Sequence, residues 1–560
     1  MTQDLGDDLA PRFDLDQVLY TVRFSRLFVR RGGGGLDVHR AAYERSARDS
    51  IVVAGLRLLD PAGAAADVEE VTPRHIVFRG GPSLVVTPED GVHIGGLPRG
   101  WSVVADLGLP AAEAAVTGER LQVPGDAEVG LDDGVTTVRL PVGGEVSIAC
   151  NGPLRAGHDV ASEAVARDLA EWMGRCPEVA GKWRGVTRFC WWVLGVNTLR
   201  LAAPDGLNRA VVPSKIGYVG LWQWDAYFIA LGLRHGDPGL AAEQMRIALA
   251  YPTPEGQLPD VVHEQGILAS SDDLPSGDLE TLRRLGSPSL AHARVPLTKP
   301  PLTALAVQLL TEQCGDGIVD EFLDVMLAAQ RWWYGPSAPN GQPAYLHPYS
   351  SGLDDSPIFD HDAILVSPDL TSYLVLSDGL LAGWLDERGR SAEANECRDR
   401  AEASLDALLA TWDDARGFFP SIGESGASVR PETIVSLMPL LTPGLPDRLL
   451  EKLTASVVDP GRFDTPHPLP TVAVHDALFA PERMWRGPVW VNTNWLVIQG
   501  LRRHGRTELA DRMARETLEL VAGAGPCEYF HPFTGEKVPS ATTCFGWSAA
   551  LAVDLAVALS

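Results

Sequence analysis

The hydrophobic period of the chain changes near residue 155, and this change limits the folds that the chain can adopt. Before that point, short runs rich in Val, Ile and Leu alternate with turn sequences such as DPAG, RGGP and PEDG. Short strands at close spacing are typical of a β-sandwich. After about residue 160 the apolar residues follow a helical period, in segments that include 162–175, 300–314, 369–387 and 432–455. Such helices, joined by loops without strand patterns, predict an all-α toroid built from helical hairpins.

The length of 560 residues is more than a single hydrophobic core usually holds. We therefore predict an N-terminal β-sandwich domain over residues 1–155 and a helical domain over 156–560. Three connections in the helical region, near 252–298, 335–368 and 460–492, are long and rich in Pro, Gly and Asp. Long loops in a compact domain usually carry function, so we expect the active site there.

Composition excludes several classes of partner. A formal charge of −26 disfavours nucleic acid, whose phosphates must be neutralised by Lys and Arg. No stretch of about 18 apolar residues predicts a membrane span, and the acidic N-terminus does not resemble a signal peptide. The seven cysteines are odd in number and irregularly spaced, as in proteins kept reduced. We expect a cytoplasmic protein, and the sequence leaves its oligomeric state open.

Tryptophan is unevenly distributed. Of fifteen tryptophans, only Trp101 precedes residue 155. Several others stand beside polar residues or glycine in the stretches Trp222–Asp225, Trp485–Trp490 and Phe545–Trp547. A sugar presents apolar C–H faces and a rim of hydroxyls, so its pocket needs aromatic surfaces next to hydrogen-bonding groups. This pattern predicts a carbohydrate site, against the alternative that these tryptophans only fill the core.

Two acidic residues in unusual surroundings are candidates for catalysis. Hydrolysis of a glycoside needs one protonated acid for the leaving oxygen and one carboxylate for the water or the sugar. Asp354 lies in the aromatic and proline-rich stretch HPYSSGLDDSPIFDHD, and Glu528 lies in CEYF, between apolar neighbours. Asp355 is the alternative to Asp354 as the acid.

These stretches resemble, in the same order along the chain, the motifs of glycoside hydrolase family 63 and, more distantly, of the family 37 trehalases. The resemblance spans roughly residues 185–558. It rests on the following stretches: LWQWDAYF at 221–228, GQLPD at 256–260, TKPPL at 298–302, the Asp354 loop, WRGPVWVNTNW at 485–495, EYFHP at 528–532 and FGW at 545–547. The resemblance implies an (α/α)6 barrel and inverting, exo-acting cleavage of a small α-glucoside, α-mannoside or short oligosaccharide, without a metal or cofactor.

The resemblance also implies roles for individual residues. Asp354 takes the role of the general acid and Glu528 that of the general base, with the two carboxyls about 6.5–9.5 Å apart to admit a water. The following residues are expected to bind substrate: Trp222, Trp224, Asp225, Phe228, Gln257, Lys299, Tyr349, Gly352, Trp485, Arg486, Trp490, Asn492 and Trp547. This chain departs from the family pattern at Ser350, where Glu is frequent, and at Lys299, where Gln is frequent. These departures leave the sugar and the aglycone open.

Other interpretations remain at this stage. The helical toroid could belong to a phosphorylase, or to a sugar-binding protein without catalysis. Arg486 could form a structural ion pair instead of contacting substrate. The histidines of the candidate loops lack metal-ligand spacing, so we expect no metal among His347, His361, His467 and His531. We expect Cys527 to pack in the core and Gly32–Gly35 to form a turn.

Overall fold

The computed structural model describes residues 13–43, 48–107, 121–132, 135–202, 209–264 and 297–560, apart from 152 and 155, together with a few isolated residues between 206 and 286. Internal contacts divide the chain into two units. The first comprises Met1–Cys176, Trp191–Arg200 and Val211–Val219, and the second comprises Pro177–Cys190, Leu201–Ala210 and Gly220–Ser560. The boundary at residue 155 stays a prediction, because the two units interleave along the chain.

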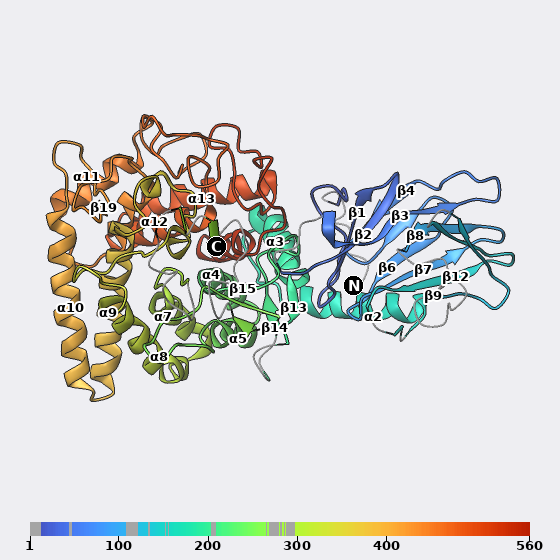
Figure 1. Ribbon diagram of the computed structural model, residues 1–560, viewed down its shortest axis with the longest axis horizontal. Helices are drawn as coiled ribbons and strands as arrows, with labels where there is room; N and C mark the ends of the chain where they lie inside the picture. The colour runs from blue at the N-terminus through green and yellow to red at the C-terminus, as the bar shows by residue number, and fades with distance from the viewer. Residues whose placement is uncertain are drawn as a thin grey trace. The chain divides into compact units, whose positions relative to one another are not determined.

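The first unit contains two antiparallel six-stranded sheets (Figure 1). The first sheet has the order β1 (Leu27–Gly32), β2 (Gly35–Arg40), β3 (Ile51–Leu59), β8 (Ser102–Asp106), β11 (Val135–Arg139) and β10 (Glu128–Asp132). The second has the order β4 (Val68–Val71), β5 (Ile76–Phe78), β6 (Ser83–Val86), β7 (Gly91–Leu97), β12 (Gly144–Ala149) and β9 (Leu121–Gln122). The predicted β-sandwich is confirmed.

Two details of this unit follow from its glycines and caps. Gly33 and Gly34 have φ of 56° and 78°, and they form the predicted turn, which joins β1 to β2. Helix α2 (His158–Met173) packs on β6, β7 and β12, and its first residue, His158, hydrogen-bonds to Ser83 of β6 at 2.9 Å. It begins four residues before the predicted start at 162, because the Glu145 carboxylate accepts the His158 N–H at 2.9 Å and so caps the helix.

The second unit is an (α/α)6 barrel, as predicted. The helices that follow α2 are α3 (Arg184–Val196), α4 (Gln223–Leu233), α5 (Pro238–Ala248), α7 (Thr303–Cys314), α8 (Gly317–Tyr334), α9 (Pro368–Glu387), α10 (Ser391–Ala410), α11 (Asp447–Val457), α12 (Val491–Arg503), α13 (Thr507–Ala524) and α14 (Gly546–Ala558). Helix α3 begins in the second unit and ends in the first, to which the strand β13 (Thr198–Arg200) also belongs, and β14 (Arg209–Val211) begins in the second unit and ends in the first. The other short strands belong to the second unit: β15 (Leu221–Trp222), β16 (Val261–His263), β17 (Gly266–Ile267), β18 (Leu365–Val366) and β19 (Ile422–Gly423). The described 3-10 helices are η2 (Arg48–Ser50), in the first unit, and η3 (Gly181–Trp183), η6 (Pro348–Ser351), η7 (Pro357–Phe359) and η8 (Ile434–Leu441), in the second.

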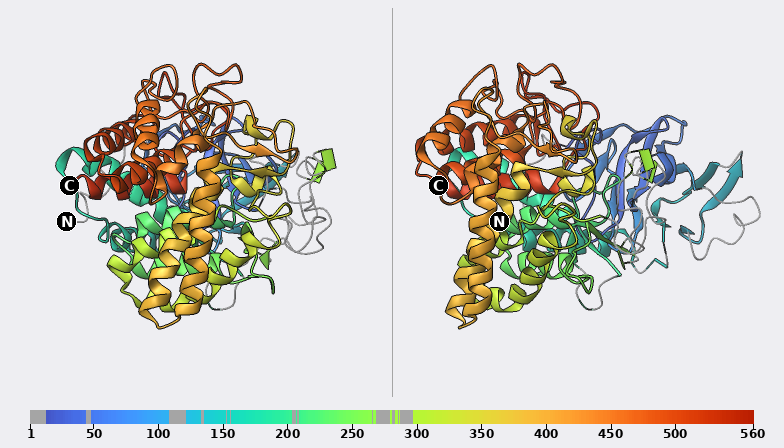
Figure 2. Two further views of the ribbon diagram at one scale, coloured as in Figure 1. Left: turned by 90° about the vertical axis from the view of Figure 1, so that its left-hand side faces the viewer. Right: turned by 60° about the vertical axis from the view of Figure 1, so that its left-hand side comes forward.

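Helices α4 and α14 form the centre of this unit. Every residue of α4 is buried, which requires partners on all sides of the helix. Gly232 allows α14 to approach, because a Cβ there would lie 2.4 Å from the carbonyl oxygen of Ala550. By contrast, α10 keeps many residues exposed and pairs along its length with α9, as Figure 2 shows. Inner, buried helices beside outer, half-exposed ones are what a helical barrel requires.

One predicted helix is wrong. The segment 432–455 forms the short 3-10 helix η8, an irregular link and α11. Pro439, Pro443 and Pro446 interrupt it, because proline lacks the N–H that a helix needs and clashes with the preceding turn. The apolar period alone does not reveal this break.

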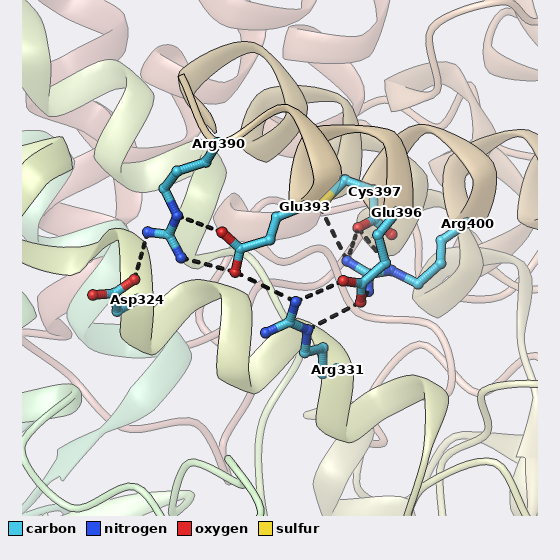
Figure 3. Close-up of polar contacts among 8 residues, drawn as sticks. Asp324, Arg331, Arg390, Glu393, Glu396, Cys397 and Arg400 are labelled. Atoms are coloured by element: carbon cyan, nitrogen blue, oxygen red, sulfur yellow. Dashed lines mark hydrogen bonds and ion pairs between the residues drawn. The ribbon is translucent and has the colours of Figure 1, made fainter. Parts of the chain in front are cut away.

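Arginines and carboxylates tie α8, α9 and α10 together (Figure 3). We call this group the α8–α10 ion network; its members are Asp324, Arg331, Asp378, Arg390, Glu393, Glu396 and Arg400. Arg331 of α8 donates to Glu396 of α10 at 2.6 Å, and Arg400 of α10 donates to the buried Asp378 of α9 at 2.7 Å. The network therefore fixes three neighbouring helices.

Candidate active site

Asp225 stands in the first turn of α4. The turn is set by the strand β15, which ends at Trp222, and by Gln223, whose N–H donates to the Asp260 carbonyl at 2.7 Å. Burial raises the pKa of Asp225 well above its usual value; the charge of Lys299 lowers it, whereas Glu528 and Asp354 raise it further. Asp225 thus lies within electrostatic reach of both predicted catalytic carboxyls, although the three residues are far apart in sequence.

The loop that carries Asp354 turns against Trp224. After η6, Gly352 adopts a φ of 72°, and a Cβ there would lie 2.3 Å from the Trp224 ring. Glycine is therefore required for both the backbone conformation and the space. The Ser351 hydroxyl accepts the N–H of Leu353 at 3.0 Å and stabilises the turn. These contacts bring Asp354 beside the aromatic residues of α4.

The neighbours of Asp354 anchor this loop to the segment 483–486. Asp355 accepts the Trp485 N–H at 2.8 Å and an N–H from Arg483 at 3.2 Å. Asp360 forms a two-pronged ion pair with Arg486, which raises the pKa of this guanidinium. Arg486 thus forms the structural ion pair that the alternative interpretation expected. A contact between Arg486 and substrate stays a prediction.

Glu528 belongs to an extended segment paired with the chain next to α12. Phe530 and Val489 exchange backbone hydrogen bonds of 3.0 and 2.8 Å. The Thr542 N–H donates to Oε2 of Glu528 at 2.9 Å, which fixes the orientation of the carboxyl group. Tyr529 lies 4.6 Å from Trp490 between ring centroids, donates to Ser540, and has a pKa raised to about 12 by burial. The carboxyl group of Glu528 is therefore buried and held in one orientation.

Five predicted aromatic residues meet in one cluster. Trp485 and Trp490 stack at 3.7 Å with an angle of 6° between their planes. Between ring centroids, Trp224 lies 6.1 Å from Trp485, 5.4 Å from Trp547 and 5.8 Å from Phe228. These rings come from α4, from the segment before α12 and from the start of α14. The site cluster is thus assembled by the tertiary fold.

Three aromatic members of the cluster were not predicted as site residues. The ring centroid of Trp495 lies 6.1 Å from that of Phe228, and the ring centroid of Phe545 lies 5.0 Å from that of Trp547. Tyr529 packs against Trp490. All three lie inside the motif stretches, so the signal was present in the sequence. The sequence does not give the position of each ring relative to the carboxyls.

Three buried polar groups in the motif stretches form no hydrogen bond with the described part of the chain. Among the described residues, none lies within hydrogen-bonding distance of the amide of Asn492, of Nε1 of Trp547 or of Nε2 of His347. His347 accepts the Tyr349 N–H on Nδ1, and burial and the charge of Lys299 lower its pKa to about 3. His347 is therefore neutral with its proton on Nε2. Buried polar atoms need partners, and hydroxyls of a bound sugar would provide them.

The remaining predicted residues are Trp222, Gln257 and Lys299. Trp222 is the N-cap of α4 and is half-buried. Gln257 donates to the carbonyl of Leu297 at 3.4 Å, directly before Thr298 and Lys299. Lys299 is buried and donates from Nζ to the carbonyl of Tyr349 at 2.5 Å.

Three other features of the described residues concern metal binding, the Cys527 thiol and the membrane. The described part of the chain contains no group of three His, Cys, Asp or Glu side chains that could hold a metal ion. Burial raises the pKa of Cys527 to about 12, so this thiol is a poor nucleophile at neutral pH. None of the described helices is long and apolar enough to span a membrane.

Comparisons with known proteins agree with this geometry. The domain family described as mannosylglycerate hydrolase MGH1-like glycoside hydrolase domain matches residues 218–548. The mannosylglycerate hydrolase of Thermus thermophilus is 29% identical over 406 residues, covering 61% of this chain and 95% of that protein. The glucosylglycerate hydrolase of Mycolicibacterium hassiacum is 25% identical over 440 residues, covering 64% and 97%.

A solved structure also matches. A family 63 mannosylglycerate hydrolase from Thermus thermophilus, in complex with Tris and D-glycerate, gives a TM-score of 0.56 at 25% identity, covering 66% of this chain and 99% of that one. A helical barrel with convergent carboxyls and an aromatic cluster defines the class of barrel glycosidases. Within that class, this chain belongs to glycoside hydrolase family 63, in its mannosylglycerate hydrolase MGH1-like branch.

Proposed function

We propose that this protein is an inverting, exo-acting hydrolase of a small α-glycoside, with Asp354 as general acid and Glu528 as general base. The observation that carries this proposal is the buried Asp225 beside the aromatic cluster, where the charges of both Asp354 and Glu528 act on it. The names of the relatives favour an α-mannosyl or α-glucosyl glycerate as the substrate. The acid-base mechanism needs no metal.

The reaction requires one proton transfer on each side of the sugar. Asp354 donates its proton to the leaving oxygen as the glycosidic bond breaks. A water attacks the anomeric carbon from the opposite face, and Glu528 takes a proton from that water. The product is the β-anomer, Asp354 ends ionised and Glu528 ends protonated, and exchange with solvent restores both groups.

Contacts around the two residues support these assignments. The oxygens of Asp355 are engaged by the segment 483–486, which favours Asp354 as the acid. The hydrogen bond from Thr542 leaves Glu528 in a fixed orientation suited to a base. The aromatic rings provide surfaces for the C–H faces of the sugar, and Asp225 accepts hydrogen bonds from its hydroxyls.

One experiment tests activity, substrate and stereochemistry together. Proton NMR follows the purified protein with α-mannosyl glycerate, α-glucosyl glycerate and the uncharged α-glucosyl glycerol. We expect a glycerate glycoside to be hydrolysed fastest, with the β-sugar released first. First release of the α-anomer would refute inversion, and no hydrolysis of any α-glycoside in a wider panel would refute the proposed function.

A further inference from the structure

Lys299 is a buried lysine that contacts two separate parts of the active site. Its Nζ donates to the Tyr349 carbonyl at 2.5 Å, and its backbone N–H donates to Oε1 of Gln223 at 3.1 Å. The preceding Thr298 donates its N–H to the Ser350 hydroxyl at 3.4 Å. Burying an ammonium group is costly unless it interacts with acceptors or opposite charge, so this position calls for an explanation.

The two contacts join the segments that carry the site carboxyls. Gln223 begins α4, in the same turn as Asp225, while Tyr349 belongs to η6, directly before the Gly352 turn and Asp354. A change at Lys299 would therefore alter the position of the Asp354 loop relative to the start of α4.

Lys299 also brings positive charge to a place rich in carboxyl groups. Asp354 and Glu528 both act on Asp225 and disfavour its ionised form, whereas Lys299 favours that form. The other charged or titratable groups nearby contribute little positive charge: His347 is held neutral, and Arg486 is paired with Asp360. Lys299 acts on Asp225 through its charge, while its hydrogen bonds go to the Tyr349 carbonyl and to Gln223.

We infer that Lys299 is a positioning residue of the hydrolytic reaction, which holds the Asp354 loop against the start of α4 and brings a positive charge to the carboxyls of the site. This inference rests on the proposed function. Lys299 acts on the substrate through Asp225 and Asp354.

The charge is tested by the pH dependence of kcat/KM in Lys299→Gln and Lys299→Met. Glutamine retains a hydrogen-bond donor but has no charge, and methionine has neither. Without the cation, the pKa of Asp225 rises, so we expect the acid limb of the profile to move to higher pH by about one unit in both variants. In an Asp225→Asn background, the same substitutions should produce no further shift. An unchanged acid limb in both single variants would overturn the inference.

The positioning is tested without substrate, by hydrogen exchange of the segment 347–354. We expect faster exchange there in Lys299→Met, and a smaller increase in Lys299→Gln. Lys215→Met is a matched control, since Lys215 is also buried and donates to Thr21 and the Val22 carbonyl, in the first unit. It should lower the melting temperature without changing exchange at 347–354 or the pH profile. If Lys299→Met exchanged at 347–354 at the wild-type rate, the positioning role of Lys299 would be refuted. This measurement needs no substrate, so the positioning role and the proposed hydrolytic function can be refuted independently.

Discussion

Asp378 and Asp225 are both buried aspartates of the second unit, and their surroundings are opposite. Asp378 accepts two hydrogen bonds from Arg400, at 2.7 and 3.1 Å, and one from Gln330 at 2.8 Å. Burial raises the pKa of Asp378, and the hydrogen bonds and charge of Arg400 oppose this rise. Asp225 is favoured in its ionised form by the charge of Lys299, and two further carboxyls act against that form. Asp378 is satisfied by the protein, whereas we propose that Asp225 interacts with substrate.

The same contrast separates the α8–α10 ion network from the active site as a whole. In the network each carboxylate has an arginine within hydrogen-bonding distance (Figure 3). In the site, the arginine contacts go to Asp355 and Asp360, which position the loop around Asp354. Substitutions in the network should therefore change stability, and substitutions in the site should change activity.

The largest expected effect is on catalysis by Glu528→Gln and Asp354→Asn. Each removes a proton-transfer group, so kcat should fall by about 10³-fold or more, near the upper part of the range for acid-base catalysis. The melting temperature should stay near that of the wild type. The exposed Glu536, in the same segment as Glu528, provides the control, because Glu536→Gln should retain full activity. Near-normal hydrolysis by either variant would show that the substituted residue is not the proposed general acid or general base.

The second effect is on stability. Arg400→Met leaves Asp378 buried without its cation, which should lower the free energy of unfolding by about 3–5 kcal/mol. Urea denaturation followed by tryptophan fluorescence measures the loss, and kcat of the folded fraction should be unchanged. Arg398→Met, on the same helix and half-exposed, is the control and should cost much less. If the Arg400 variant kept its stability but lost activity, the assignment of a structural role to the α8–α10 ion network would be wrong.

A third substitution, Asp225→Asn, should separate binding from folding. It removes a charged hydrogen-bond acceptor, so kcat/KM should fall about 10- to 100-fold, equivalent to about 1.5–3 kcal/mol. Because a buried carboxylate with a raised pKa disfavours folding at neutral pH, the melting temperature should not fall. Calorimetry and steady-state kinetics on the same preparation measure both quantities. A clear loss of stability with normal kinetics would make Asp225 a structural residue.

The smallest effect is expected from Arg331→Gln in the exposed part of the network. Hydrogen bonds from Arg331 lower the pKa of Glu396. This contribution is present above the usual glutamate pKa of 4.5 and is lost as pH falls through the lowered value. We expect a difference of less than about 1 kcal/mol at pH 7, which shrinks as the pH falls below 4.5. Thermal unfolding of both proteins across that range checks this, and a difference that grows towards acid pH would contradict it.

Much of the fold could be predicted from local patterns. The short apolar runs before residue 155 indicate strands, and the helical period afterwards indicates a barrel, because both patterns reflect which face of each element is buried. The failure at 432–455 has a local cause that the period does not report, since three prolines remove the N–H groups that a continuous helix requires. The site motifs were equally visible, as Trp485–Trp490 and Phe545–Trp547 show.

The sequence by itself determined the two kinds of architecture, the motif stretches and the candidate carboxyls, because these depend on residue type and on spacing along the chain. Only the tertiary structure decided that Asp355 and Asp360 anchor the loop of Asp354, that Arg486 pairs with Asp360, and that Lys299 joins Tyr349 to Gln223. The physical reason is that ionisation and hydrogen bonding depend on distances of a few ångströms between groups that lie far apart along the chain, and the order of residues does not contain those distances.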